Sequence, residues 1–131
     1  MAFSFVIQKH NSRTLHYDLR LEKDGVFKSW AVPKGVPEGQ GVRRLALQVE
    51  DHALAFGDFQ GVIPEGEYGA GTIEIWDRGT YELQEWQDDR IVFTLFGERL
   101  KGTYNLVRFR HGRDREWLIF RRRSAADGSR A

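Results

Sequence analysis

Short segments in which apolar and polar residues alternate recur along the chain, and turn-forming residues separate them. Alternation with a period of two indicates half-buried strands, and the segments are rich in β-branched and aromatic residues. No segment has the convincing periodicity of an amphipathic helix. The predicted strands are Ser4–Lys9, Leu15–Lys23, Val26–Val32, Arg43–Asp51, Thr72–Asp77, Thr80–Trp86, Ile91–Phe96, Thr103–Arg110 and Glu116–Arg122. The pattern predicts an all-β fold, an antiparallel sandwich or barrel.

Turn residues between these segments predict antiparallel hairpins. The predicted turns are Lys23–Gly25, Asp77–Gly79 and His111–Gly112. Pro33–Gly41 and Gly57–Gly71 are predicted to be longer loops, where functional sites often lie. Gly66–Gly71 is glycine-rich, but no strand-to-helix context surrounds it, so we interpret it as a turn and not as a nucleotide site.

Length and composition predict one soluble domain. The 131 residues suffice for one hydrophobic core, and we assign residues 1–123 to the domain and 124–131 to a disordered tail. The chain has no cysteine, which excludes disulfides, thiolate metal sites and a cysteine nucleophile and favours the cytoplasm. We expect no membrane span and no export signal, because long apolar stretches are missing.

Charge is unevenly distributed along the chain. Residues 101–131 carry nine Lys/Arg and three Asp/Glu, whereas residues 1–100 carry eleven and sixteen. A basic C-terminal third is suited to following a phosphate backbone. A solvated strand face with a frayed tail explains the same distribution equally well.

Two predicted strands separate polar from apolar side chains. In Leu15–Lys23, one face contains His16, Asp18, Arg20 and Glu22, opposite Leu15, Tyr17, Leu19 and Leu21. In the segment from Arg43 to His52, one face contains Arg44, Ala46, Gln48, Glu50 and His52, opposite Leu45, Leu47 and Val49. If both polar faces border one groove, imidazoles, carboxylates and guanidiniums meet there.

This combination of groups is suited to phosphoryl chemistry assisted by a metal. Neutral imidazoles and a carboxylate bind a borderline divalent ion, and arginines recognise phosphate in a bidentate manner. The alternative interpretation is that the histidines are structural and lie on the solvent-exposed face of a sheet. The spacing of His10, His16, Asp18 and Arg20, with a second cluster from Glu50 to His52, favours the functional interpretation. Lys34 leaves a strand at a proline-stiffened turn and can reach a phosphate.

Several motifs together resemble the 3′-phosphoesterase family, which occurs as a module of bacterial DNA ligase D and as free-standing proteins. The resemblance runs in order from about Phe5 to Phe120. Its motifs are Phe5–His10, Leu15–Glu22, Ser29–Gly35, Val49–His52, Gly66–Gly71 and Trp76–Gly79.

The resemblance implies a compact antiparallel β-barrel with a polar, crescent-like active-site groove. It implies a manganese-dependent hydrolase, with cobalt or zinc as alternative metals, that acts on 3′ ends of DNA or RNA/DNA primers. Such enzymes trim a terminal ribonucleotide to a 3′-phosphate and then remove the phosphate, leaving a 3′-hydroxyl for repair. A DNA ligase and a polymerase/primase of end joining are the implied partners. We expect a monomer.

The resemblance also assigns roles to residues. His10, Asp18 and His52 are the expected metal ligands. His16 and Arg20 are expected to contact the scissile phosphate and act in catalysis, with His16 protonating the leaving oxygen. Glu50 is expected to orient a neighbour or a water in catalysis. Lys34 and Arg44 are expected to add positive charge for phosphate binding.

Two departures from the family pattern favour phosphate removal over ribonucleotide trimming. Phe56 stands where many relatives carry a tyrosine, and nine residues precede His10, where many relatives have a charged arm. Two rival hypotheses remain: a non-catalytic module that binds nucleic-acid ends for a ligase or polymerase, and metal-free ribonuclease chemistry by His10 and His16.

Overall fold

The structure is a computed structural model that describes residues 3–109 and 114–123. The predicted tail and the predicted turn at 111–112 lie outside the described residues. The strands are β1 (Phe3–Asn11), β2 (Leu15–Lys23), β3 (Val26–Val32), β4 (Arg43–His52), β5 (Gly61–Ile63), β6 (Gly71–Gln87), β7 (Arg90–Gly97), β8 (Lys101–Arg108) and β9 (Glu116–Arg121). A short 3-10 helix, η1 (Leu54–Asp58), is the one helical segment in the described part of the chain, where no helix is long and apolar enough to cross a membrane.

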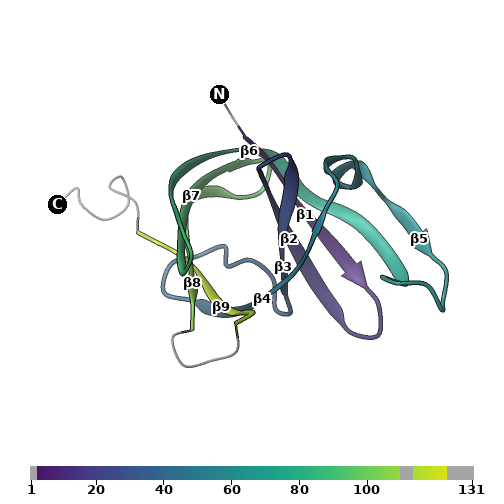
Figure 1. Ribbon diagram of the computed structural model, residues 1–131. Coiled ribbons are helices and arrows are strands. Elements are labelled where there is room, and N and C mark those ends of the chain that lie inside the picture. Colours follow the sequence, from purple (N-terminus) through teal and green to yellow (C-terminus); the bar gives the residue numbers. More distant parts are fainter. Residues whose placement is uncertain (1–2, 110–113, 124–131) are drawn as a thin grey trace.

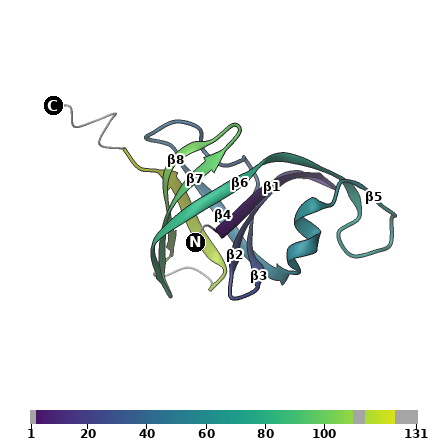
Figure 2. The same ribbon diagram turned by 90° about the horizontal axis from the view of Figure 1, so that it is seen from above.

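Antiparallel pairing closes the sheet into a barrel, so the predicted all-β barrel is confirmed. The strand order is β1-β2-β3-β4-β9-β8-β7-β6, and β6 pairs with β1 to close the circle. β5 pairs with the first residues of β6, outside the barrel. Figures 1 and 2 show the barrel on one side and, on the other, β5 with the β1–β2 hairpin and the adjoining half of β6.

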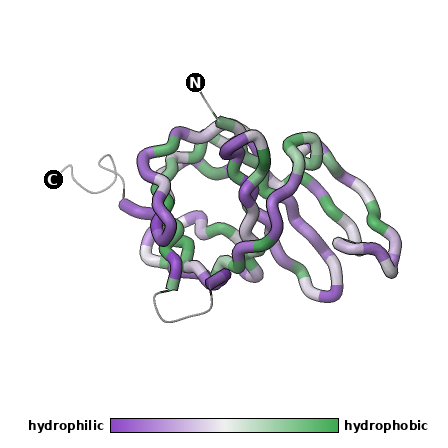
Figure 3. The backbone as a smooth tube through the Cα atoms, viewed as in Figure 1, coloured by the Kyte–Doolittle hydropathy of each residue, from purple (hydrophilic) through white to green (hydrophobic). Residues whose placement is uncertain are grey.

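Aromatic and branched side chains fill the barrel. Leu19 and Leu21 have no exposed surface, as the predicted apolar face of the second strand requires, and Trp30 of β3 has none either. Leu15, on the same predicted face, is 43% exposed because it lies at the end of the β1–β2 hairpin. Figure 3 shows the alternation of hydrophobic and hydrophilic residues along the barrel strands.

The predicted turn at Asp77–Gly79 is wrong, because these residues lie within the single long strand β6. The register between β1 and β6 shifts beside Ile7, so Trp76 forms a bulge that bends the strand without ending it. Asp77 is buried, and its carboxylate accepts hydrogen bonds from backbone N–H groups. An Asp-x-Gly sequence is a turn signal only where the carboxylate has no distant donors to accept from.

A bulge also overturns the predicted common face of β4. β3 residues Phe27 and Ser29 pair with His52 and Val49, so β4 has one extra residue between these pairs. The extra residue reverses the alternation, and His52 therefore shares a face with Val49 rather than with Gln48. The predicted loop at 57–71 likewise contains β5, an edge strand too short to give a clear alternation.

We expect Asp77→Ala to lower the free energy of unfolding by about 3 kcal/mol, because it removes a buried carboxylate and leaves several backbone N–H groups without their acceptor. Oδ1 accepts from the N–H groups of Arg78, Glu98 and Arg99 at 2.9, 2.7 and 3.0 Å, and Oδ2 accepts from Leu100 at 2.9 Å. Urea unfolding measures the change. Asp58→Ala is the control, since Asp58 is exposed and its ion pair with Arg78 contributes less than about 1 kcal/mol. Equal losses in the two variants would contradict this role of Asp77.

Candidate active site

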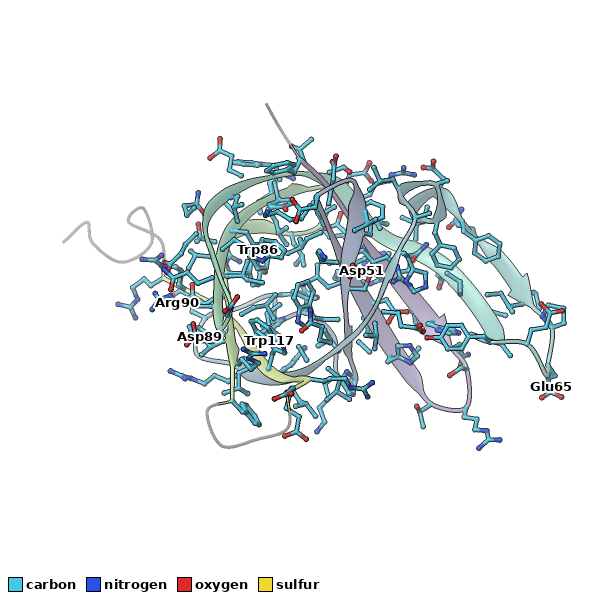
Figure 4. The ribbon with its side chains drawn as sticks, viewed as in Figure 1. Asp51, Glu65, Trp86, Asp89, Arg90 and Trp117 are labelled. Carbon is cyan, nitrogen blue, oxygen red and sulfur yellow. The ribbon has the colours of Figure 1, made fainter. Side chains whose placement is uncertain are left out.

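The predicted site residues of β1 and β2 line a cavity of about 440 Å³. The cavity lies where the β1–β2 hairpin extends past the barrel, and η1 and the 64–71 loop complete its walls. Figure 4 labels Glu65 at the tip of that loop. The lining residues are His10, His16, Asp18, Arg20, Ala31, Val49, His52, Phe56, Ile63, Tyr68, Gly69 and Ile73.

The hairpin register brings two imidazoles and a carboxylate together. His10 pairs directly with His16, and their rings lie 4.7 Å apart between centroids. Asp18 lies between them: its Oδ2 is 3.6 Å from His10 Nδ1, and its Oδ1 is 3.4 Å from His16 Nε2. Ligand atoms of these three residues all lie within 4.8 Å of one another, and in the described part of the chain this is the group that could hold a metal ion.

The remaining ring nitrogens orient both imidazoles for metal binding. His10 Nε2 lies 3.1 Å from the carbonyl of Ala70, and His16 Nδ1 lies 3.4 Å from the carbonyl of Thr14. When each ring donates an N–H from this nitrogen to the carbonyl, its other nitrogen carries a lone pair that faces Asp18. Backbone carbonyls commonly fix metal-binding histidines in this way. The donor set therefore fits a borderline divalent ion.

Arg20 is almost fully buried, and acceptors from three neighbouring groups hold its guanidinium. Nε donates to Gln8 Oε1 at 2.6 Å, and Nη1 donates to Ser29 Oγ at 2.8 Å. Nη2 lies 3.4 Å from Asp18 Oδ2. Burial lowers the pKa of Arg20, and the charge of Asp18 opposes this effect. The cavity thus has a fixed guanidinium beside the histidine–aspartate group.

His52 lies beside Arg20 and outside the group of His10, His16 and Asp18. Its Nδ1 is 3.1 Å from Arg20 Nη1 and 3.0 Å from the carbonyl of Glu50, so it accepts from Arg20 in one tautomer and donates to Glu50 in the other. Burial and the charge of Arg20 lower the pKa of His52. Phe56 packs against both groups, with its ring 4.9 Å from the His52 ring and 5.0 Å from Arg20 Cζ.

The carboxylate of Asp18 changes the titration of its neighbours. A hydrogen bond to Asp18 raises the pKa of His16, although burial acts in the opposite direction. Burial would raise the pKa of Asp18, but the hydrogen bond with His16 and the charge of Arg20 outweigh it, and the net pKa is lowered. Asp18 is therefore ionised at neutral pH, as a metal ligand must be.

The other predicted site residues lie outside the cavity lining. Arg44 donates to the carbonyls of Lys34 and Gly35 at 2.8 and 3.0 Å, far along β4 from His52. Lys34 is exposed in the same region. Glu50 is exposed at the rim, where its carboxylate shares a hydrogen bond with the hydroxyl of Tyr68. The structure thus groups four of the predicted residues of β1 and β2 with His52, and not with Lys34 or Arg44.

Three residues at the site were missed from the sequence. Gln8 is fully buried and connects Arg20 to the carbonyls of Phe56 and Phe59. Ser29 holds the other side of Arg20, and Tyr68 lines the cavity. Alternation along β1 places Gln8 on the face of His10, so this residue had a usable signal. Ser29 and Tyr68 lie within the motifs Ser29–Gly35 and Gly66–Gly71, but local alternation gave them no role, because their positions at the site depend on strand pairing and on the loop path.

Comparisons with known proteins give matches over most of the chain. The family model of the DNA ligase D 3′-phosphoesterase domain matches residues 8–108. The multifunctional non-homologous end joining DNA repair protein LigD of Mycobacterium tuberculosis is 46% identical over 128 residues, which cover 95% of this chain and 16% of that protein. The corresponding LigD protein of Pseudomonas aeruginosa is 44% identical over 130 residues, which cover 95% of this chain and 15% of that protein. The chain spans about one sixth of the length of these relatives.

We expect His16 and His52 of the metal-free protein to titrate separately, with the pKa of His16 above that of a free histidine and that of His52 below it. Asp18→Asn should lower the pKa of His16, because the neutral amide no longer stabilises the protonated ring. NMR titration of the imidazole ring protons measures both values. Asp58→Asn is the control, because Asp58 is exposed and paired with Arg78. A His16 pKa that Asp18→Asn leaves unchanged would disprove the coupling.

Proposed function

The chain belongs to the DNA ligase D 3′-phosphoesterase domain family, and from this membership we propose that it is a metal-dependent hydrolase that removes a 3′-phosphate from a DNA end. The product is a 3′-hydroxyl that repair synthesis or ligation can use. The observation that carries the proposal is the convergence of His10, His16 and Asp18 beside the buried guanidinium of Arg20. Such a site combines metal ligands with a fixed phosphate-binding cation.

His10, His16 and Asp18 are the proposed metal ligands, with manganese the first choice and cobalt or zinc the alternatives. This assignment exchanges the roles first expected for His16 and His52. It is supported by the ring nitrogens of His10 and His16 that face Asp18, and by the contact of His52 with Arg20 instead. A ring nitrogen that binds a metal cannot also carry the proton for a leaving oxygen, so His16 no longer serves as general acid.

The metal would supply an activated water and polarise a phosphate oxygen. Arg20 binds the phosphate oxygens and stabilises the negative charge of the transition state, and its acceptors Gln8 and Ser29 keep it in place without reorganisation. His52 contacts the same phosphate next to Arg20, as a neutral ring whose pKa is lowered. Phe56 covers Arg20 and His52 and limits the access of water.

The remaining roles concern the substrate and its surroundings. We propose that Glu50 acts through its hydrogen bond with Tyr68 at the rim of the cavity. If Lys34 and Arg44 contact the substrate, they do so outside the cavity. The printed names of the relatives describe multifunctional end-joining proteins, which supports a proposal that this domain works with a DNA ligase and a polymerase/primase. The proposed substrates are 3′ ends of DNA or of RNA/DNA primers.

We expect the protein to convert a duplex primer with a 3′-phosphate to a 3′-hydroxyl when manganese is present and not when a chelator is present. Gel analysis of the primer measures the conversion. Arg20→Ala should slow turnover about a hundredfold or more while metal binding persists, because it removes transition-state charge stabilisation. His10→Ala should lose both turnover and metal binding. Arg90→Ala is the matched control, because Arg90 is far from the cavity and partly exposed.

Two outcomes of this assay would favour the rival hypotheses. Metal binding without conversion would identify a module that binds nucleic-acid ends. Conversion of a ribonucleotide-ended primer that is insensitive to the chelator would favour metal-free chemistry by the histidines.

We expect Phe56→Tyr to increase trimming of a terminal ribonucleotide about five- to tenfold relative to phosphate removal. The new hydroxyl would lie in the cavity wall beside His52 and Arg20, where it can hydrogen-bond the substrate. The rates on the two primers measure the ratio. Phe59→Tyr is the control, since Phe59 stacks on Phe56 but does not line the cavity. An unchanged ratio would mean that this hydroxyl does not set the preference.

A further inference from the structure

A second cavity, of about 430 Å³, opens on the opposite side of β3 and β4 from the active-site cavity. β3 contributes Trp30 to the second cavity and Ala31 to the active-site cavity, and β4 contributes Gln48 and Val49 in the same way. Figure 4 labels Trp86 and Trp117, which line this cavity, on the far side of the view from Glu65. None of the residues that line it has a role in the proposed hydrolysis.

Three tryptophans from three strands form the wall of the second cavity. Trp30 and Trp117 are buried and pack edge to face, with centroids 5.7 Å apart. Trp86 is half-buried and lies 6.2 Å from Trp30, and Lys23 Nζ lies 5.4 Å from the centre of its ring. Planar aromatic rings such as nucleobases stack on surfaces of this kind.

The cavity is rich in hydrogen-bond donors. The indole N–H of Trp30 is buried and has no hydrogen-bond partner in the described part of the chain. Trp117 Nε1 donates to Gln48 Oε1 at 3.1 Å, which uses the amide oxygen and keeps the amide NH₂ of Gln48 as a donor. An indole can only donate, and a buried donor without an acceptor is costly. A ligand that fits this cavity therefore carries hydrogen-bond acceptors on a planar ring.

Two cations, Lys28 and Arg108, and one carboxylate, Asp88, also line the cavity. Lys28 pairs with Asp51 at 2.9 Å, at one side of the opening. The guanidinium of Arg108 lies 5.7 Å from the centre of the Trp117 ring. Lysine and arginine beside aromatic surface are the usual partners of a phosphate that is attached to a stacked base.

A third cavity, of about 610 Å³, lies at the edge of β4. It begins where the hydrogen bonding of β4 with β9 ends, at the bond from the Gln48 N–H to the carbonyl of Arg115. It shares Gln48 and Arg108 with the tryptophan cavity and Val49 with the active-site cavity. In Figure 4, Asp51, which lines this third cavity, lies between the labels of Trp86 and Glu65.

We propose that the tryptophan cavity binds a nucleotide unit. Its base stacks on Trp86 and accepts hydrogen bonds from Trp30 and Gln48, and its phosphate lies near Lys28 and Arg108. The unit is either a free nucleotide or an unpaired nucleotide of the bound strand. The choice of a nucleotide over another planar anion rests on the proposed function, in which DNA is the substrate.

NMR of the indole N–H groups tests the proposal with the full chain in the presence of a chelator, so no turnover is needed. Deoxyguanosine 5′-monophosphate and a short single-stranded oligodeoxynucleotide with a 3′-hydroxyl are the two probes. We expect saturable shifts of the Trp30 and Trp117 signals and no shift of the Trp76 signal, since Trp76 lies outside the cavity. Shifts with the mononucleotide support a free nucleotide, and shifts with the oligonucleotide alone support an unpaired nucleotide of the strand.

Gln48→Glu is the discriminating variant, because it keeps the acceptor for Trp117 but replaces the NH₂ donor with a negative charge. We expect it to weaken binding at least about tenfold. Gln84→Glu, the same change on the exposed face of β6, should bind as the wild type does. If Gln48→Glu does not fold, Arg108→Gln should weaken binding about fivefold.

Two results would overturn the proposal: neither probe shifts the Trp30 signal, or the folded Gln48→Glu or Arg108→Gln variant binds like the wild type. Because the measurement uses a chelator and unreactive ends, a failed phosphatase assay with retained indole shifts would disprove the proposed function alone.

Discussion

The buried guanidinium of Arg20 constrains the strands around the site. A charged group can be held in a protein interior only if acceptors surround it, and here they come from β1, β2, β3 and β4. Gln8 extends this network to η1 through the carbonyls of Phe56 and Phe59. The same hydrogen bonds therefore close the barrel side of the cavity and fix the group that the proposed reaction uses to bind phosphate.

The hairpin of β1 and β2 places the group of His10, His16 and Asp18 beside the hydrogen bonds of Arg20. Direct pairing places His10 opposite His16, and the alternation of β2 places Asp18 and Arg20 on the same face. The cavity is thus built from neighbouring positions of two strands, with a loop and a helix turn as its cover. β3 and β4 line two cavities because successive side chains of a strand point to opposite faces.

The fold was largely predictable because successive residues of a β-strand alternate between its two faces, so the sequence of a half-buried strand alternates between apolar and polar residues. Leu19 and Leu21 are buried as their alternation with charged residues indicates, and seven of the nine predicted strands have one observed counterpart each. The errors occur where one residue breaks the alternation. A bulge at Trp76 merges two predicted strands into β6, and a bulge before His52 separates His52 from the predicted face of Arg44 and Gln48. A bulge depends on the partner strand, which a local pattern does not contain.

The sequence by itself determined the fold class, the ionic face of β2 and the set of chemical groups at the site, because these follow from residue type and a period of two. Only the tertiary structure decided which of those groups meet. It brought His16 together with His10 and Asp18 in a group that could hold a metal ion, set His52 against Arg20, left Lys34 and Arg44 outside the cavity, and enclosed Trp30 with Trp86 and Trp117. These neighbours come from register and barrel closure, which join residues far apart in the chain through contacts that no single segment specifies.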